Sequence, residues 1–406
     1  MRFDYDLLII GGGLVGASLA CALGRSGLRI GVVEPVTFDA QQQPSYDDRA
    51  IALAHGSQRI FSGMGLWDRL AKQVTPIAQI HVSDRGRFGF TRLRHEEAGV
   101  AALGYIATAR LLGAVLVGRL SELDQVELLC PARLEGVRRA ADAIHVEIDV
   151  DGACRSLSTR LLVAADGAES AVRDRFGIPV TVWDYGQSAI VANVSTQLDH
   201  KNIAYERFTA QGPIAMLPMG ARHCAIVWSV RSERLAALET LDDAGFLLAL
   251  QDNFGYRLGR FEAVGKRASY ALRLVRARDA VGPRLALIGN AAHALHPIAG
   301  QGFNLGLRDV AALAECLAEA ARAGADPGNA PLLRRYAEWR RHDQGRVIAF
   351  TDGLTRLFAN PLLPVALLRD AGMLALDVLP PAKRLFERLT MGRVGRLPRL
   401  ARGLPL

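Results

Sequence analysis

The stretch Tyr5-Asp-Leu-Leu-Ile-Ile-Gly-Gly-Gly-Leu-Val-Gly16 joins a short apolar run to a glycine-rich turn. A continuous apolar run of this length is typical of a parallel strand that is covered on both faces. The small and apolar residues from Ala17 to Ser26 predict a helix that stops at Gly27, and Leu28 to Val33 predicts a second strand. We therefore expect a complete βαβ unit near the N-terminus. The residues from Leu7 to Gly24 carry no charge. Because Asp4 and Asp6 precede them and glycines interrupt them, we expect neither a signal peptide nor a transmembrane helix there.

The spacing Gly11-x-Gly13-x-x-Gly16 is typical of a dinucleotide-binding turn. The first glycine permits the turn, the second lets the backbone approach a pyrophosphate, and the third packs the helix on the strand. The N–H groups at the start of the helix then face the phosphates. Glu34 ends the second strand, where its carboxylate would accept a hydrogen bond from a ribose hydroxyl. An acid at this position favours FAD or NAD over NADP, because the 2′-hydroxyl must be free.

Further along the chain the pattern changes to that of antiparallel strands. Apolar residues alternate from Ile144 to Val150, Asp151-Gly152 is a hairpin turn signal, and the return strand extends to Ala165. Several short strand-like runs then follow one another between Ser188 and Val230 without intervening helices. We interpret them as a second, mainly antiparallel domain inserted into the first.

Composition excludes several other classes of protein. The 406 residues are 50% hydrophobic and 22% charged, which excludes intrinsic disorder. The net charge of +8 comes without a helix-turn-helix or zinc-finger pattern, so we expect no nucleic-acid partner. The five cysteines lie far apart without a C-x-x-C, which argues against disulfides and zinc. His293 and His296 lack a carboxylate at metal-ligand spacing, and we expect no metal.

Two further segments decide between FAD and NAD. One is Leu162-Val-Ala-Ala-Asp-Gly-Ala-Glu-Ser-Ala-Val-Arg173, and the other runs from Leu287 to Asp309 and contains Gly300-Gln-Gly302. With the N-terminal glycines, they make nearly the whole chain resemble the FAD-dependent aromatic monooxygenases of the p-hydroxybenzoate hydroxylase class. Within that class the chain is most similar to the ubiquinone-biosynthesis hydroxylases, on segments such as Tyr205-Glu-Arg-Phe208 and Gly212-Pro-Ile-Ala-Met-Leu-Pro218.

This resemblance implies an α/β fold with three parts. They are a discontinuous Rossmann-like FAD-binding domain, an inserted mainly antiparallel β-sheet domain for the substrate, and a helical C-terminal segment. We expect them to cover, in that order, residues 1–75, 100–180 and 275–345; residues 76–99 and 181–274; and residues 346–406.

The resemblance also implies which residues contact FAD. They are Gly11, Gly13, Gly16, Glu34, Arg49, Arg110, Asp166, Gly167, Gly289, Asn290, Gly300, Gln301, Gly302 and Asn304. His296, Pro297 and Gly300 are expected near the isoalloxazine, where backbone N–H groups and a helix N-terminus would stabilise the negative charge of the reduced flavin. Asp166-Gly167 resembles a motif linked to both FAD and NAD(P)H. Position 290 is usually Asp in this class and is Asn here.

The implied reaction is driven by the coenzyme, so no side chain is expected to react itself. NAD(P)H would reduce FAD transiently, and O2 would form a flavin C4a-hydroperoxide that hydroxylates a polyprenylated phenol. The inserted sheet would shield the ring from water, with Ile214, Met216, Leu217 and Trp228 against the substrate. A reductase or halogenase of the same fold, or an FAD-bearing subunit without catalysis, are the alternatives.

The C-terminal segment suggests how such a substrate is reached. Apolar residues lie near basic ones in residues 361–406. Pro361, Pro364, Pro380 and Pro381 break the apolar stretch too often for it to span a bilayer. It is expected either to lie on an anionic membrane surface or to pack as a helical cap or subunit interface. We accordingly expect a cytoplasmic protein that is peripheral on the inner face of the bacterial membrane, with a complex of ubiquinone-biosynthesis proteins as a further partner.

Overall fold

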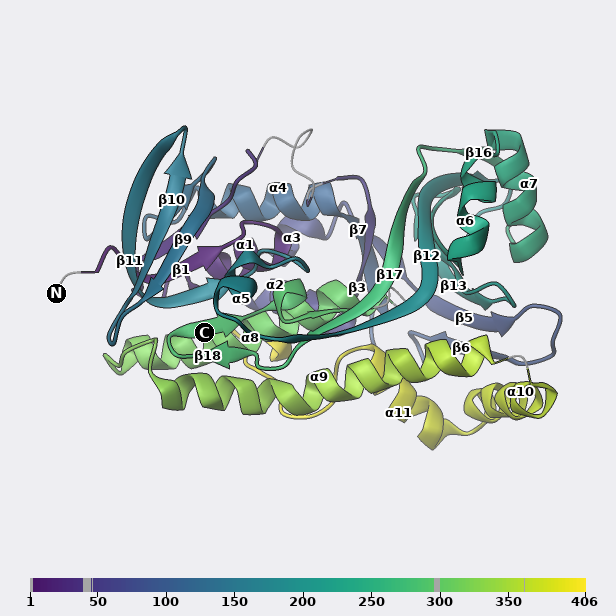
Figure 1. The fold of residues 1–406 in the computed structure, drawn as a ribbon. Coiled ribbons are helices and arrows are strands. Elements are labelled where there is room, and N and C mark those ends of the chain that lie inside the picture. Colours follow the sequence, from purple (N-terminus) through teal and green to yellow (C-terminus); the bar gives the residue numbers. More distant parts are fainter. Residues whose placement is uncertain (1–2, 39–44, 46, 296–299, 361) are drawn as a thin grey trace.

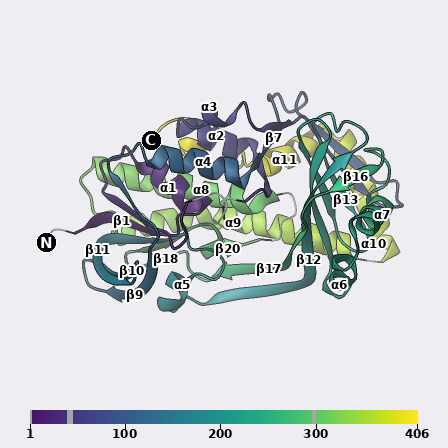
Figure 2. The same ribbon diagram turned by 90° about the horizontal axis from the view of Figure 1, so that it is seen from above.

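The computed structural model describes residues 3–38, 45, 47–295, 300–360 and 362–406. An eight-stranded sheet lies at the N-terminal end of the molecule and a nine-stranded sheet at the other (Figures 1 and 2). A three-stranded sheet lies between them, formed by β3 (Ala50–Ala54), β7 (Gly104–Thr108) and β4 (Thr75–Ile77). This mixture of helices and sheets confirms the predicted α/β fold.

The eight-stranded sheet contains the predicted βαβ unit. Strand β1 (Tyr5–Ile10) lies between β2 (Ile30–Val33) and β11 (Ala153–Ala164), and all three are parallel. Helix α1 (Leu14–Leu23) starts three residues earlier than predicted, because Gly13 is extended and the backbone becomes helical directly after it. The sheet is completed by β8 (Val126–Leu129), β9 (Arg133–Arg139), β10 (Ile144–Val150), β18 (Val281–Gly282) and β19 (Leu285–Leu287).

One face of this sheet is covered by apolar helices. Helix α1 packs against α4 (Ala109–Leu120) and against α8 (Gln301–Arg322). Almost every residue of α8 from Asn304 to Ala318 is buried, so it is the central helix of the core. The predicted hairpin at Asp151-Gly152 is confirmed, since β10 and β11 pair in antiparallel register from Ile144 opposite Thr159 to Val150 opposite Ala153.

The nine-stranded sheet is mainly antiparallel, as predicted for the inserted region. Its path is β20-β17-β12-β15-β14-β13-β5-β6, and β16 pairs with β12. The bounds are β5 (Gln79–Asp84), β6 (Phe90–Arg94), β12 (Val180–Thr196), β13 (Ile203–Phe208), β14 (Ile214–Met219), β15 (His223–Arg231), β16 (Phe261–Val264), β17 (Ala268–Ala277) and β20 (His293–Ala294). Strands β12 and β17 are long enough to run from this sheet back towards the first (Figure 2).

Helices cover the lower side of both sheets. Helix α9 (Ala330–Ala359) runs beneath the molecule in Figure 1 and leads to α10 (Leu363–Val378), which contacts β6, and then to α11 (Pro380–Thr390). No helix among the described residues is both long enough and apolar enough to cross a membrane. The remaining helices are α2 (His55–Gly63), α3 (Trp67–Leu70), α5 (Ala171–Arg175), α6 (Ser232–Glu239), α7 (Asp243–Phe254) and the 3-10 turns η1 (Gly289–Ala291) and η3 (Leu400–Arg402).

Candidate active site

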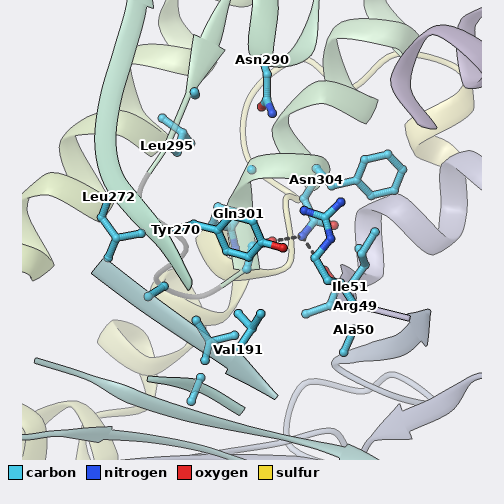
Figure 3. A pocket seen from close by; sticks show the side chains of 18 of the residues that line it. Arg49, Ala50, Ile51, Val191, Tyr270, Leu272, Asn290, Leu295, Gln301 and Asn304 are labelled. Atoms are coloured by element: carbon cyan, nitrogen blue, oxygen red, sulfur yellow. Dashed lines mark hydrogen bonds between the residues drawn. The ribbon is translucent and has the colours of Figure 1, made fainter. Parts of the chain in front are cut away.

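A single cavity of about 2210 Å³ extends from the glycine turn of β1 to the nine-stranded sheet and the C-terminal helices. Pockets for small ligands are usually about 300–1,000 Å³, so this cavity has room for a dinucleotide and a second molecule. Figure 3 shows Arg49, Tyr270, Gln301 and Val191 converging on one part of it, from the loop before β3 and from β17, α8 and β12.

The glycines of the N-terminal turn are fixed by close backbone approaches. Gly11 has a φ of +103°, and a Cβ there would lie 2.5 Å from the carbonyl oxygen of Ala165. A Cβ on Gly16 would lie 1.9 Å from the carbonyl oxygen of Gly11. Gly13 precedes α1 without a side-chain cap, and it lines the cavity with Leu14. The uncapped N–H groups of α1 are therefore available to a phosphate, as the glycine spacing predicts.

Glu34 holds this turn together from the end of β2. Its carboxylate accepts hydrogen bonds from the Gly12 N–H at 2.7 Å and from the Val36 N–H at 3.1 Å. The side chain is buried and lines the cavity. A carboxylate that is fixed by two backbone donors is preorganised to accept a further hydrogen bond from a ribose.

Asp166 and Gly167 follow the end of β11 and line the same cavity. The Asp166 carboxylate accepts hydrogen bonds from the Ser170 hydroxyl at 2.5 Å and from the Val172 N–H at 3.1 Å, so it also fixes the start of α5. Burial raises the pKa of Asp166, although these hydrogen bonds act in the opposite direction. Gly167 has a φ of +90°, a conformation that a side chain rarely adopts.

Arg49 and Arg110 both reach the cavity wall. Arg49 forms an ion pair with Asp47 at 2.6 Å, and its guanidinium lies 5.7 Å from the centre of the Tyr270 ring. Arg110 binds Asp48 through two hydrogen bonds of 2.7 and 3.1 Å. Because these pairs are partly exposed, they hold the arginines weakly, and an anionic ligand can compete for both.

A second glycine turn opens onto the cavity at the start of α8, where Gly300 is left-handed. Its φ is +59°, and a Cβ there would lie 2.9 Å from the Ala52 Cβ. No side chain caps α8, and Gly300, Gln301 and Gly302 all line the cavity. The predicted positions of His296 and Pro297 lie outside the described residues.

Asn304 lines the cavity, but its amide group forms hydrogen bonds to other residues of the chain. Its nitrogen donates to the carbonyl oxygens of Ala52 at 2.8 Å and Gly300 at 2.6 Å. Its oxygen accepts from the Ala54 N–H at 2.8 Å and the Ser57 hydroxyl at 2.6 Å. With both amide hydrogens donated and two donors on its oxygen, Asn304 fixes the start of α8 against β3.

Gly289 and Asn290 form the turn after β19, and only Asn290 lines the cavity. A Cβ on Gly289 would lie 3.1 Å from two side-chain carbons of Val15, so Gly289 lets this turn approach α1. The Asn290 side chain is exposed to the cavity, in view in Figure 3.

A buried ionic network supports this turn, and sequence patterns did not reveal it. The Asp309 carboxylate accepts from His293 Nε2 at 2.6 Å, from Arg340 Nε at 2.7 Å and from the Gly289 N–H at 3.1 Å. Burial acts to raise the pKa of Asp309, but His293 and Arg340 outweigh it and hold that pKa well below its usual value. His293 therefore pairs with Asp309 rather than with a metal, and no cluster among the described residues could hold one.

The expected substrate residues divide between two faces of the nine-stranded sheet. Leu217 lines the cavity, whereas the fully buried Ile214, Met216 and Trp228 do not. Their side chains lie in the core on the opposite face, together with Phe246 of α7. The prediction that Ile214, Met216 and Trp228 lie against the substrate is therefore wrong. The cavity side is formed instead by the alternate residues Ala215, Leu217, Ala225 and Val227, because successive side chains of a strand point to opposite faces.

The residues present fit FAD. Two uncapped helix N-termini, those of α1 and α8, open onto the same cavity, and each can face one of the negatively charged parts of this coenzyme. Three residues of these two turns lie so close to other atoms that only glycine fits, namely Gly11, Gly16 and Gly300.

Comparison with known proteins agrees with this geometry. A family described as FAD binding domain matches residues 4–351. The chain is 43% identical over 404 residues to the ubiquinone hydroxylase UbiL of Rhodospirillum rubrum, covering 99% of this chain and 93% of that protein. It is 31% identical over 391 residues to the 3-demethoxyubiquinol 3-hydroxylase of Escherichia coli, covering 95% and 98%.

Solved structures show the same fold. The p-nitrophenol 4-monooxygenase PnpA from Pseudomonas putida DLL-E4 has a TM-score of 0.81 at 19% identity, covering 98% of this chain and 100% of that one. The protein is thus a flavoprotein monooxygenase with FAD as its cofactor, and NAD(P)H and O2 are the co-substrates typical of this class. On sequence and fold together, the chain belongs to the FAD-dependent hydroxylases of ubiquinone biosynthesis.

Proposed function

We propose that this enzyme hydroxylates a polyprenylated phenol on the route to ubiquinone. The observation that carries the proposal is the continuity of the cavity. The compartment with the coenzyme turns runs without interruption into a second compartment between the nine-stranded sheet and helices α9 to α11. The side chains of the second compartment are mostly apolar, and on the helices they include Phe350, Leu354, Phe358, Leu368, Met373, Leu376 and Phe386.

The apolar compartment suits an isoprenoid tail. An apolar chain gains about 25 cal/mol for each Å² that it removes from water, which favours binding along such a lining. Leu368 of α10 lines the cavity although 74% of its surface is exposed. It therefore marks a place where the cavity meets the outside, through which a tail longer than the cavity could extend.

The chain's own residues bind, orient and shield in this scheme. The bound FAD, reduced by NAD(P)H, would supply the oxygen-transfer chemistry, which we assign to a flavin C4a-hydroperoxide. The N-terminus of α8 would face the flavin and stabilise its negative charge. Ala215, Leu217 and Val227 would keep water from the reacting ring, because they form an apolar wall opposite the turns.

The surface around Leu368 favours contact with a lipid membrane. Large apolar side chains are exposed on and beside α10 and α11, together with the exposed Arg384 and Arg388. Apolar residues next to basic ones are typical of segments that lie on an anionic membrane. The exposed apolar residues are Leu362, Leu367, Leu368, Val378, Leu379 and Leu385.

The reaction can be tested on the purified enzyme reconstituted with FAD. We expect a prenylated phenol to stimulate NAD(P)H oxidation and O2 uptake, with a product that is heavier by one oxygen atom. A series of phenols with longer prenyl tails should give progressively lower KM values until the apolar compartment is filled. Reduction of a double bond or incorporation of halide would favour the alternative reactions of this fold. NAD(P)H oxidation that no phenol stimulates would contradict the proposal.

The membrane surface can be tested separately. Val378→Glu combined with Leu385→Glu adds two charges to the exposed surface without touching the cavity lining. We expect this variant to lose binding to vesicles of anionic phospholipid and to retain its turnover of a short-chain phenol. Unchanged vesicle binding would show that this surface serves another purpose, such as contact with a protein.

A further inference from the structure

Glu206 lies in the middle of the cavity wall that the nine-stranded sheet forms. The pairing register places one residue from each of several strands in a continuous row across that wall. Every member of the row lines the cavity. In order, the row is Ala268, Val191, Val227, Ala215, Glu206, Val82 and Thr91.

Glu206 is the only ionisable residue in this row. The parallel row on the same face, two residues further along each strand, contains Leu217, Ala204 and Ile80 beside Glu206 and is apolar there. Across the cavity, α9 and α11 contribute Leu354, Phe358 and Phe386. A carboxylate that is surrounded by apolar groups is costly, because burial removes its water without supplying a partner. Such a group needs a specific explanation.

No partner for this carboxylate exists within the described part of the chain. None of the hydrogen bonds or ion pairs of these residues involves the Glu206 side chain. Arg369 of α10, a cation that also lines the cavity, is ion-paired with Asp84. Burial alone raises the pKa of Glu206 to about 7. The side chain is partly exposed, and the cavity is what it faces.

Glu206 and the coenzyme end of the cavity lie apart along the same wall of the sheet. Val191 lies on the same face of the sheet as Tyr270, because Ala189 pairs with Tyr270 and Val191 with Ala268. The centre of the Tyr270 ring lies 5.7 Å from the Arg49 guanidinium, which marks this end of the row as the coenzyme end. Glu206 is three strands away from Val191, which is about 14 Å at the usual spacing of about 4.8 Å between strands. A ring that lies between the two would present one edge to the coenzyme and the other edge to the carboxylate.

We infer that Glu206 binds the hydroxyl group of the phenolic substrate and accepts its proton during oxygenation. This inference rests on the proposed function. It assigns to one side chain both the orientation of the ring and the increase in its electron density. An unpaired carboxylate is the natural acceptor for a phenol, and it gains the partner that the chain does not provide.

The proposed step starts at the phenol hydroxyl group. The phenol O–H bond breaks, and the proton moves to the Glu206 carboxylate. The electron pair that remains on the phenol oxygen raises the electron density of the ring, and a ring carbon forms a bond to one oxygen atom derived from O2. The O–O bond breaks, and the second oxygen leaves as water. The same carbon loses its hydrogen as a proton when aromaticity returns, and Glu206 gives its proton back to the phenol oxygen, which restores the carboxylate. NAD(P)H supplies the two electrons through FAD.

The test compares Glu206→Gln and Glu206→Leu with Glu262→Gln. Glu262 is an exposed residue of β16 in the same sheet, so its variant makes the same chemical change away from the cavity. Flavin absorbance is measured first, to establish that each variant contains FAD. Binding of a prenylated phenol and of its O-methyl ether is then measured, together with the amount of product formed per NAD(P)H consumed.

We expect the wild-type enzyme and Glu262→Gln to bind the phenol at least tenfold more tightly than the ether. Glu206→Leu should lose this preference and still bind the ether. Glu206→Gln should bind both ligands but form at least tenfold less product per NAD(P)H, with H2O2 as the alternative product. Its kcat should also lose the rise that the wild type shows as pH increases through about 7, because only the carboxylate accepts a proton.

Two results would overturn the inference in distinguishable ways. If both Glu206 variants hydroxylate the phenol with wild-type coupling and preference, Glu206 has no such role, and the proposed function is unaffected. If the FAD-loaded wild type neither binds nor hydroxylates any prenylated phenol, the proposed function fails, and the role of Glu206 fails with it.

Discussion

The two ends of the cavity are built on different principles. At the coenzyme end, backbone atoms form the site, and glycines are required because Gly11, Gly16 and Gly300 lie too close to other atoms for a side chain. At the sheet end, side chains form the site, and the alternation of each strand decides which of them face the cavity and which face the core. Added side-chain atoms should therefore disrupt the coenzyme end, whereas single substitutions at the sheet end should change which ligand binds there.

The largest effect should follow from Gly16→Val at the coenzyme end. Even the first added carbon would lie 1.9 Å from the Gly11 carbonyl oxygen, so α1 must move away from β1. We expect the purified protein to be colourless or unfolded, as measured by flavin absorbance and thermal unfolding. Gly118→Ala is the control, because nothing lies within 4 Å of its new carbon and alanine favours the α4 helix by up to about 1 kcal/mol. Full FAD content in Gly16→Val would contradict the requirement for close approach.

The next effect concerns the ionic network behind the coenzyme end. Asp309→Asn removes the charge that faces His293 and Arg340, and breaking a buried pair in this way costs about 3–5 kcal/mol in the free energy of unfolding. Asp326→Asn is the control, since its pair with Arg284 is partly exposed and contributes about 0–1 kcal/mol. Chemical denaturation measures both.

The pH dependence of this effect has a definite sign. The folded chain holds the pKa of Asp309 well below its usual value near 3.8. The stabilisation is therefore complete above pH 3.8 and is lost as pH falls below it, because protonation then opposes folding. The difference in the free energy of unfolding between the wild type and Asp309→Asn should therefore become smaller in acid. A gap that is constant or widens at low pH would show that the charge of Asp309 is not what stabilises the fold.

At the sheet end, two adjacent residues of β14 should give opposite results. Met216→Ala empties part of the core behind the sheet and should cost about 2–5 kcal/mol of stability, with unchanged affinity for the substrate. Leu217→Ala should leave stability within about 1 kcal/mol of the wild type, because Leu217 borders a cavity, and should raise KM for a prenylated phenol. Denaturation and steady-state kinetics measure both. If Leu217→Ala lowered stability and Met216→Ala raised KM, the substrate would bind on the opposite face of the sheet from the one that we describe.

This contrast also explains what the sequence could and could not predict. The strand, turn and helix around Gly13 depend on local contacts, so their pattern is visible in consecutive residues. In β14, both the cavity-facing Ala215 and Leu217 and the core-facing Ile214 and Met216 are apolar, so alternation carries no signal about which face is the cavity.

Partners that are distant in the chain were hidden for a related reason. The Asp309 network joins α8 to Arg340 of α9, and nothing in the local pattern of either helix points to the other. Asn304 lies in a motif that predicts contact with FAD, yet its amide holds β3, which is 250 residues earlier at Ala54. Both features depend on how helices pack. The one signal in the sequence was Asp309 itself, an acidic residue within the apolar stretch that forms α8.

The smallest effect should come from Asn290→Asp at the coenzyme end, which introduces the residue that is usual at this position in the class. Asn290 faces the cavity as a neutral amide, and Asn290→Asp would supply a charged acceptor to a hydroxyl of FAD. A hydrogen bond to a charged group is stronger than a neutral one by roughly 1 kcal/mol, which corresponds to a few-fold tighter binding of FAD. Titration of the apoprotein with FAD measures the change, and Asn329→Asp, which precedes α9 away from the cavity, is the control. Weaker binding in Asn290→Asp would mean that the side chain meets negative charge instead, which would place the pyrophosphate rather than a hydroxyl beside it.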